Sequence, residues 1–170
     1  AEVADVLHRL GNAYGALGDD AKKRDMLERA LAIFERAYGR DHPKGVGTLR
    51  DLGTAYGDLG DHAKKRDMLG RVLAIEEREY GRDHPEMAKT LNNLSGVYRK
   101  LGDNAKARDL LECALAIKER AYGREHIEIA ASLYNLGFVH VALGDNAKAR
   151  EYVARALAIA ERAYGSDHPR

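Results

Sequence analysis

The sequence lacks the features on which several protein classes depend. A single cysteine among 170 residues excludes a disulfide framework and a zinc site built from several cysteines. No apolar run approaches the ~18–20 residues that a membrane span needs, and no signal-peptide pattern opens the chain. With three prolines and no tryptophan, the composition also leans away from β-rich folds. We therefore expect no disulfide scaffold, no membrane association and a mainly helical chain.

An excess of charge of one sign is also missing. The chain has 28 lysines and arginines against 27 aspartates and glutamates, which gives a formal net charge of +1 at pH 7. This balance argues against a nucleic-acid binder and against an acidic tail protein. Hydrophobic residues make up 45% and charged residues 32%, as in a soluble folded chain. We expect a cytoplasmic protein, and because the sequence opens at Ala1 we expect an excised or processed piece.

The sequence does have a repeat of 42 residues without insertions. Four six-residue segments mark it, the first reading Tyr-Gly-Arg-Asp-His-Pro, and they begin at Tyr38, Tyr80, Tyr122 and Tyr164. A Leu-Gly-Asp triplet keeps the same step and begins at Leu17, Leu59, Leu101 and Leu143. We interpret residues 1–170 as a single array of four units, which are 2–43, 44–85, 86–127 and 128–169.

Each unit is predicted to form two helices. In the first unit, apolar residues recur at steps of three and four residues, which is the pattern of one buried helix face. The stripe of the first helix consists of Val3, Val6, Leu7, Leu10, Tyr14 and Leu17. The stripe of the second helix consists of Met26, Leu27, Ala30, Leu31, Ile33, Phe34 and Tyr38. Since the alternation typical of strands is absent, we predict no strands.

The turns carry residues suited to helix ends. Gly18 stops the first helix, and Asp19 can accept hydrogen bonds from the free N–H groups that open the second. Asp41 or His42 can cap the following helix, and Pro43 fits its first turn. These local signals predict a helix-turn-helix unit.

One such hairpin cannot bury both of its faces, whereas stacked hairpins can. We therefore predict an all-α fold, a right-handed α-solenoid of four helix-turn-helix units with about eight helices. Its inner, concave wall would be built from the first helix of each unit. Equivalent leucines of the second helices should each cost ~2–5 kcal/mol on truncation to alanine if buried, with larger losses in the inner units. These leucines are Leu31, Leu73, Leu115 and Leu157.

The repeated residues resemble tetratricopeptide repeats. That family's pattern of Leu-Gly, Tyr, Gly and Ala is followed by Leu10-Gly11, Tyr14, Leu17-Gly18 and Ala30-Leu31. The long second helix and the Tyr-Gly-Arg-Asp-His-Pro ending are similar to the 42-residue variety found in kinesin light chains and nephrocystin-type proteins. The segment Thr90-Leu91-Asn92-Asn93-Leu94 is especially similar to it. The resemblance implies a non-catalytic scaffold for protein–protein interaction.

A few positions depart from the family's pattern. Lys23 and Lys65 stand where the other two units have Ala107 and Ala149, and we expect the lysine stems to lie along the hairpin. His140 replaces the tyrosine that the other three units have at this position.

The sequence shows no reactive constellation. Histidines with an acidic neighbour recur at His42, His84, His126 and His168. Equivalent residues of stacked units lie roughly 10 Å apart, which is too far for shared zinc ligands, so we interpret these histidines as helix caps. There is no nucleophile motif and no glycine-rich phosphate loop, and we predict no enzyme, no metal and no cofactor. Cys113 stands where the other units have arginine, either as a neutral substitution or as a site of adventitious intermolecular disulfide formation.

A peptide-binding groove is expected on the first helices, between their core positions. Asparagines there can bond both the N–H and the C=O of an extended peptide, and Arg50, Lys89 and Arg99 could meet acidic groups of a ligand. Asp51 stands where an asparagine would complete the clamp of chaperone-binding relatives, so a chaperone tail is not the predicted ligand. The predicted groove consists of His8, Asn12, Arg50, Thr54, Lys89, Asn92, Asn93, Arg99, Tyr134, Asn135, Phe138 and Val141.

The fourth unit has an apolar stripe on its first helix. Tyr134, Phe138 and Val141 lie at steps i, i+4 and i+7 and share one face. This face is either an anchor pocket for an apolar peptide side chain or a surface that packs on a fifth unit or another copy. Self-association is favoured because no polar capping helix follows Pro169. The alternative to a peptide-binding scaffold is accordingly a structural spacer or oligomerisation module that stacks end to end through its terminal repeats.

Overall fold

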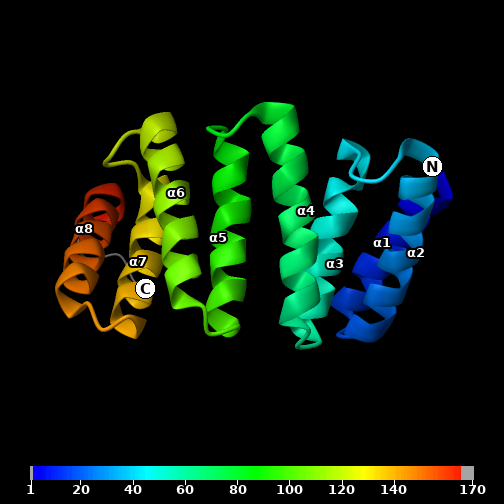
Figure 1. The fold of residues 1–170 in the computed structure, drawn as a ribbon, viewed down its shortest axis with the longest axis horizontal. Coiled ribbons are helices and arrows are strands. Elements are labelled where there is room, and N and C mark those ends of the chain that lie inside the picture. Colours follow the sequence, from blue (N-terminus) through cyan, green and yellow to red (C-terminus); the bar gives the residue numbers. More distant parts are fainter. Residues whose placement is uncertain (1, 166–170) are drawn as a thin grey trace. The chain divides into compact units, whose positions relative to one another are not determined.

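The protein, described over residues 2–165 by a computed structural model, consists of α-helices and one short 3-10 turn, with no strand in this range. In chain order (Figure 1), these are α1 (Glu2–Ala16), α2 (Asp20–Tyr38), η1 (Pro43–Gly45), α3 (Val46–Asp58), α4 (His62–Tyr80), α5 (Pro85–Lys100), α6 (Asn104–Tyr122), α7 (Ile127–Ala142) and α8 (Asn146–Tyr164). The eight α-helices of the described range pair into four hairpins, one for each predicted unit, which confirms the all-α prediction.

The chain divides into two compact bodies, each containing two hairpins. The N-terminal body is Ala1–Gly81, and the C-terminal body is Arg82–Arg170. The cap expected at His168 and the Pro169 beside it lie outside the described residues.

The predicted helix caps are confirmed throughout the described range. An aspartate carboxylate accepts from the backbone N–H three residues later at the start of each second helix, at 2.9–3.1 Å, from Asp19, Asp61, Asp103 and Asp145. A histidine Nδ1 accepts from the backbone N–H two residues later, at 3.2–3.3 Å, in His42, His84 and His126. Gly39 has a φ of 91°, as its place after a helix end requires. The repeated histidines therefore have a structural role.

The second unit opens differently from the third and fourth. Its first turn, η1, is a 3-10 turn, and α3 begins only at Val46, whereas α5 and α7 begin directly after the capping histidine. Two glycines, Gly45 and Gly47, lie in this region and disfavour the α-helix. Asp41, just before the cap, has a φ of 62°.

The core of the N-terminal body lies between successive helices of the chain. The helix α3 packs on α2, and one buried cluster consists of Leu27, Leu31, Leu49, Leu52, Tyr56, Val72 and Ile75. A second cluster joins α1 to α2 and consists of Ala4, Leu7, Ala30 and Phe34. The predicted stripe of the second helix is confirmed, because its members lie in these clusters or pack against them.

The predicted stripe of the first helix is wrong in part. Leu7 is buried and Tyr14 half-buried, but four members are exposed, namely Val3, Val6, Leu10 and Leu17. The helix buries Ala4 and Gly11 instead, on the face that meets α2. No helix of the described range packs over the other face, although the sequence makes it apolar. The helical period marks apolar residues on both faces of α1, so the sequence alone could not distinguish the buried face from the exposed one.

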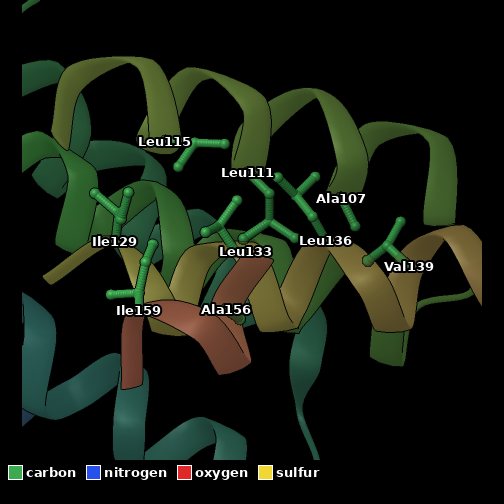
Figure 2. Packing of buried hydrophobic residues seen from close by; sticks show 9 residues of the cluster. All are labelled: Ala107, Leu111, Leu115, Ile129, Leu133, Leu136, Val139, Ala156 and Ile159. Carbon is green, nitrogen blue, oxygen red and sulfur yellow. The ribbon is translucent and has the colours of Figure 1, made fainter. Parts of the chain in front are cut away.

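One core cluster of the C-terminal body is drawn from three helices. Figure 2 shows Leu111 and Leu115 of α6 facing Ile129, Leu133 and Leu136 of α7, with Ala156 and Ile159 contributed by α8. The helix α7 therefore lies between the second helix of its own unit and that of the preceding unit. Within each body, the predicted packing of one unit on the next is observed.

In the first two hairpins, a glycine of the first helix faces a long lysine side chain of the second helix. A Cβ atom added to Gly15 would lie 2.7 Å from Cδ of Lys23, and one added to Gly57 would lie 2.6 Å from Cδ of Lys65. The lysine stems thus lie along the hairpin, as predicted, in space that a glycine leaves open. The third unit has the opposite combination, because Arg99 takes the glycine position and the buried Ala107 the lysine position.

The fourth hairpin holds a buried histidine. His140 is 2% exposed, and neither of its ring nitrogens forms a hydrogen bond within the described chain, although Nδ1 lies 3.6 Å from Oδ2 of Asp145. Its ring stacks on Tyr152 with the centroids 5.3 Å apart. The equivalent pair of the second unit is Tyr56 with Met68, so the larger residue has changed sides. Tyr56 also donates its hydroxyl to Glu28.

We expect the double variant His140→Tyr with Tyr152→Met to unfold at higher urea concentration, with a gain of about 1 kcal/mol. It removes the two buried ring nitrogens that lack hydrogen bonds, and it places a hydroxyl at the position from which Tyr56 reaches Glu28. Glu112 occupies the position of Glu28 in the third unit and can accept that bond. His140→Tyr alone is the control, and it should gain less because Tyr152 already fills the space. A double variant less stable than the unchanged chain would contradict this account.

Candidate functional site

The predicted groove residues of the N-terminal body join α1 to α3. Nε2 of His8 lies 2.7 Å from Oδ2 of Asp51, and Nδ1 lies 2.8 Å from the hydroxyl of Thr48. The amide of Asn12 donates to the same Asp51 oxygen at 2.9 Å. The side chains of His8 and Asp51 are 23% and 37% exposed, so the cluster lies at the surface. His8 and Asn12 lie close together, and both form hydrogen bonds with residues of the next unit.

The sequence predicts that Arg50 meets a ligand, whereas in the structure it pairs with a residue of its own hairpin. Its guanidinium pairs with a carboxylate oxygen of Glu76 on α4, and the Glu76 side chain is 1% exposed. The other oxygen of Glu76 has no hydrogen-bond partner in the described chain. Arg50 therefore compensates a buried charge inside its own hairpin. Thr54, one turn further along α3, is exposed and donates its hydroxyl to the backbone oxygen of Arg50 at 3.1 Å.

The polar groove residues of the C-terminal body lie on α5. The amide of Asn92 donates to the hydroxyl of Ser132 on α7 at 3.3 Å, and that hydroxyl lies 3.4 Å from Oδ1 of Asn92. Lys89 is exposed and forms an ion pair with Glu86 at 2.7 Å. Asn93 is also exposed. Asn92 thus repeats what His8 does in the first unit, namely joining a first helix to the next one.

The apolar groove residues form an exposed cluster on α7. The rings of Tyr134 and Phe138 meet edge to face, with their centroids 4.9 Å apart. The guanidinium carbon of Arg99, on α5, lies 5.8 Å from the centroid of Phe138, within the range of a cation–π interaction. Tyr134, Phe138 and Val141 are 50%, 47% and 57% exposed. We call Arg99, Tyr134, Phe138 and Val141 the aromatic cluster. Asn135, beside Tyr134 in the sequence, is half-buried.

Sequence reasoning missed three buried partners of the predicted residues. Thr48, Ser132 and Glu76 are all buried, and each holds a predicted groove residue in place. A signal for the first two exists, because a hydroxyl residue recurs at this position in three units, as Thr48, Thr90 and Ser132. No comparable signal marks Glu76, whose equivalent in the first unit is Phe34.

The shifted pKa values of buried groups have structural causes. Burial, together with the hydrogen bond to Glu28, raises the pKa of Tyr56 to about 12. Burial also lowers the pKa of Lys118, whose ammonium donates to the backbone oxygen of Glu128 at 3.0 Å. Both groups lie at contacts between helices.

The described residues offer no metal centre, because no group of three or more possible ligands occurs among residues 2–165. Among the helices of this range, none combines the length and apolar character that crossing a membrane requires. A pocket of about 400 Å³ lies beside α8, and none of the predicted groove residues lines it. It is lined by Arg124, Glu125, Glu151, Arg155, Ala158, Ile159 and Arg162. The geometry defines the class of the protein: a helical-repeat scaffold whose first helices present polar and aromatic side chains.

Comparison with known families identifies the repeats. Tetratricopeptide repeat models match residues 2–75, 59–120 and 129–170. The chain therefore belongs to the tetratricopeptide repeat family, whose members are generally scaffolds for protein–protein interaction, as the sequence predicts. A comparison with curated proteins finds no match.

Solved structures share the fold. BtubC (BKLC) from P. vanneervenii has a TM-score of 0.86 and 25% identity, with 98% of this chain and 66% of that chain covered. A putative kinesin light chain from Podosopora anserina, with nearly identical TPR-like repeats, has a TM-score of 0.83 and 26% identity, with 97% and 78% covered. The apo form of RapI is similar in fold, with a TM-score of 0.80 and 20% identity, and 95% and 57% covered. The chain thus spans less than two thirds of the length of BtubC and of RapI. The solenoid fold class and the kinesin light chain-like type of repeat are confirmed.

Proposed function

We propose that the protein is a non-catalytic scaffold that holds a peptide segment of a protein partner along the first helices of its units, with the four units acting as one array. The observation that carries the proposal is the aromatic cluster. Two aromatic rings that are each about half exposed, beside a guanidinium, form a surface suited to an apolar side chain next to an acidic one. The ligand class is therefore a peptide with an apolar anchor and a neighbouring carboxylate.

Polar residues of the first helices support the same proposal. Asn93 is exposed and can bond the backbone of an extended peptide. Asn12 and Thr54 are exposed too, but the Asn12 amide already donates to Asp51 and the Thr54 hydroxyl to the backbone oxygen of Arg50. Arg50 is not a member of this set, because it compensates Glu76. A cytoplasmic location agrees with the exposed free thiol of Cys113, since reducing compartments keep such thiols unpaired.

The proposal is tested by selecting peptides from a random displayed library on the immobilised chain. We expect the selected peptides to share an aromatic or aliphatic residue flanked by aspartate or glutamate. Phe138→Ala should weaken their binding by about tenfold or more in fluorescence polarisation, as loss of an anchor contact does. Arg99→Gln should weaken binding of the acidic peptides and lower its dependence on salt.

Tyr80→Ala provides the matched control. Tyr80 is an exposed aromatic residue at the end of α4 and lies outside the predicted groove. Its loss should leave peptide binding unchanged. Equal binding by the Phe138→Ala and Tyr80→Ala chains, or a library that yields no peptide, would contradict the proposal.

A further inference from the structure

The outer face of α8 exposes residues that are covered in other units. Leu27 and Leu111 are 0% exposed, because the first helix of the following unit packs over them, whereas the equivalent Val153 is 39% exposed. Leu157 is 52% exposed, while its equivalents Leu31 and Leu115 are each 8% exposed. We call Val153, Leu157 and the neighbouring Glu161 the tail face.

The helix α1 exposes the matching surface. In α7, the residues that pack toward the preceding unit are Ile129, Ser132 and Leu136, which are all 0% exposed. Their equivalents in α1 are Val3, Val6 and Leu10, which are 63%, 64% and 41% exposed. We call Val3, Val6, Leu10 and the neighbouring Arg29 the head face. The head-face residues of α1 thus occupy the positions whose equivalents in α7 lie against Leu111 and Leu115.

The chemistry at the margin of the two faces also matches. Inside the bodies, the junction of successive first helices is a polar pair, His8 with Thr48 and Asn92 with Ser132. The residues at the corresponding positions of the tail and head ends are Tyr134 and Val6, which are both apolar and both exposed. If these two ends meet, Tyr134 therefore faces another apolar side chain, Val6.

The charges are complementary as well. Arg71 of the second unit pairs with Glu35 of the first at 2.5 Å, and Arg155 of the fourth pairs with Glu119 of the third at 2.7 Å. The arginine at this position in the first unit is Arg29, and the glutamate at this position in the fourth unit is Glu161. Both are exposed. A junction of head face and tail face would pair them as the inner junctions pair theirs.

We propose that the tail face of one copy binds the head face of a second copy, so that α1 packs on α8 as α3 packs on α2 and α7 on α6. Such a contact is heterologous, and each dimer retains one free head face and one free tail face. Association is therefore open-ended. This junction is distinct from peptide binding, although Tyr134 borders both surfaces. It also revises the interface expected from the sequence, because Val153 and Leu157 now form its centre instead of the stripe on α7.

Sedimentation velocity over a wide range of chain concentration tests the proposal. The unchanged chain should show a weight-average mass that rises past the dimer without a plateau. Leu157→Glu and Val6→Glu should each remain monomeric, because each removes one of the two faces. Ala116→Glu is the control, since it adds the same charge at an exposed position of α6 in an inner unit, and it should associate like the unchanged chain.

Mixing the two single variants distinguishes a head-to-tail junction from a symmetric dimer. The Val6→Glu chain keeps a tail face and the Leu157→Glu chain keeps a head face, so an equimolar mixture should form discrete dimers and nothing larger. A tail-to-tail dimer would instead survive in the Val6→Glu chain alone, and that result would overturn the proposal. A strictly monomeric unchanged chain at the highest concentration would overturn it too, as would a mixture that stays monomeric.

Reversal of the charges gives an independent test of the register. Arg29→Glu should weaken self-association several-fold at low salt, and adding Glu161→Arg in the same chain should restore it. If the double variant associates as weakly as Arg29→Glu, then these two residues do not meet, and the register proposed here is wrong.

Discussion

Replacing Arg50 by alanine is expected to lower the free energy of unfolding by about 3 kcal/mol, measured by urea denaturation. The loss comes from Glu76, whose side chain is 1% exposed and would be left without the guanidinium that pairs with it. Breaking a buried ion pair by removing one partner leaves an uncompensated charge in a medium that solvates it poorly. The effect lies at the low end of the usual range because Arg50 is 39% exposed and water can enter in its place.

The sister units suggest how to remove the pair without this loss. Phe34 occupies the position of Glu76 in α2 and is 7% exposed there. The double variant Arg50→Met with Glu76→Phe should therefore recover most or all of the stability, since apolar residues of similar volume replace buried ion pairs well. Lys89→Ala is the control, because the exposed pair of Lys89 with Glu86 contributes at most about 0.5 kcal/mol.

The stability of the Arg50→Ala chain also decides which variants can test peptide binding in the predicted groove. If Arg50→Ala were as mild as Lys89→Ala, the pair with Glu76 would not hold the hairpin, and Arg50 would again be a candidate ligand-binding residue. If the loss is large, a decrease in partner binding by Arg50→Ala would report unfolding rather than a missing contact. Phe138 and Arg99 are better probes, because both side chains are exposed.

Truncation of equivalent leucines is expected to have unequal effects. Leu115→Ala should cost about 2–5 kcal/mol, because Leu115 is 8% exposed and lies in the cluster that α7 closes. Leu157→Ala should cost less than about 1 kcal/mol, because the side chain is already 52% exposed. The four equivalent leucines, all expected to be buried, should therefore lose different amounts of stability on truncation. Leu31 should behave like Leu115, and the half-buried Leu73 should lie between Leu115 and Leu157.

The measurement is urea unfolding at a concentration low enough to keep the chain monomeric. Leu157 serves as the matched control for Leu115, since both stand at the same position of a second helix and undergo the same change. A similar loss at both positions would mean that packing of the next unit contributes nothing to Leu115. That result would contradict the stacking seen within the C-terminal body.

Much of the fold was predictable because its signals are local. The aspartate caps, the glycine at the end of α2 and the histidine caps act on backbone groups within a few residues, and all were predicted from the sequence. The stripe of α2 was also predicted correctly, because this helix is covered on both sides by neighbours in the chain.

The stripe of α1 was predicted less well for the opposite reason. An apolar residue at the right helical period is buried only when another helix covers it, and within the described range α1 contacts α2 and, through His8 and Asn12, α3, while Val3, Val6 and Leu10 stay exposed. The same limit applies to the groove. His8, Asn12 and Arg50 have the residue types of ligand contacts, but their hydrogen bonds go to residues 26 to 43 positions away.

The sequence by itself determined the unit, its two helices, their ends and the family, since a 42-residue period with fixed caps repeats short-range interactions four times. Only the tertiary structure decided which apolar faces are covered and which polar side chains are already paired. Those properties depend on which helix lies opposite a residue, and partners such as Glu76 for Arg50 follow no rule of the period.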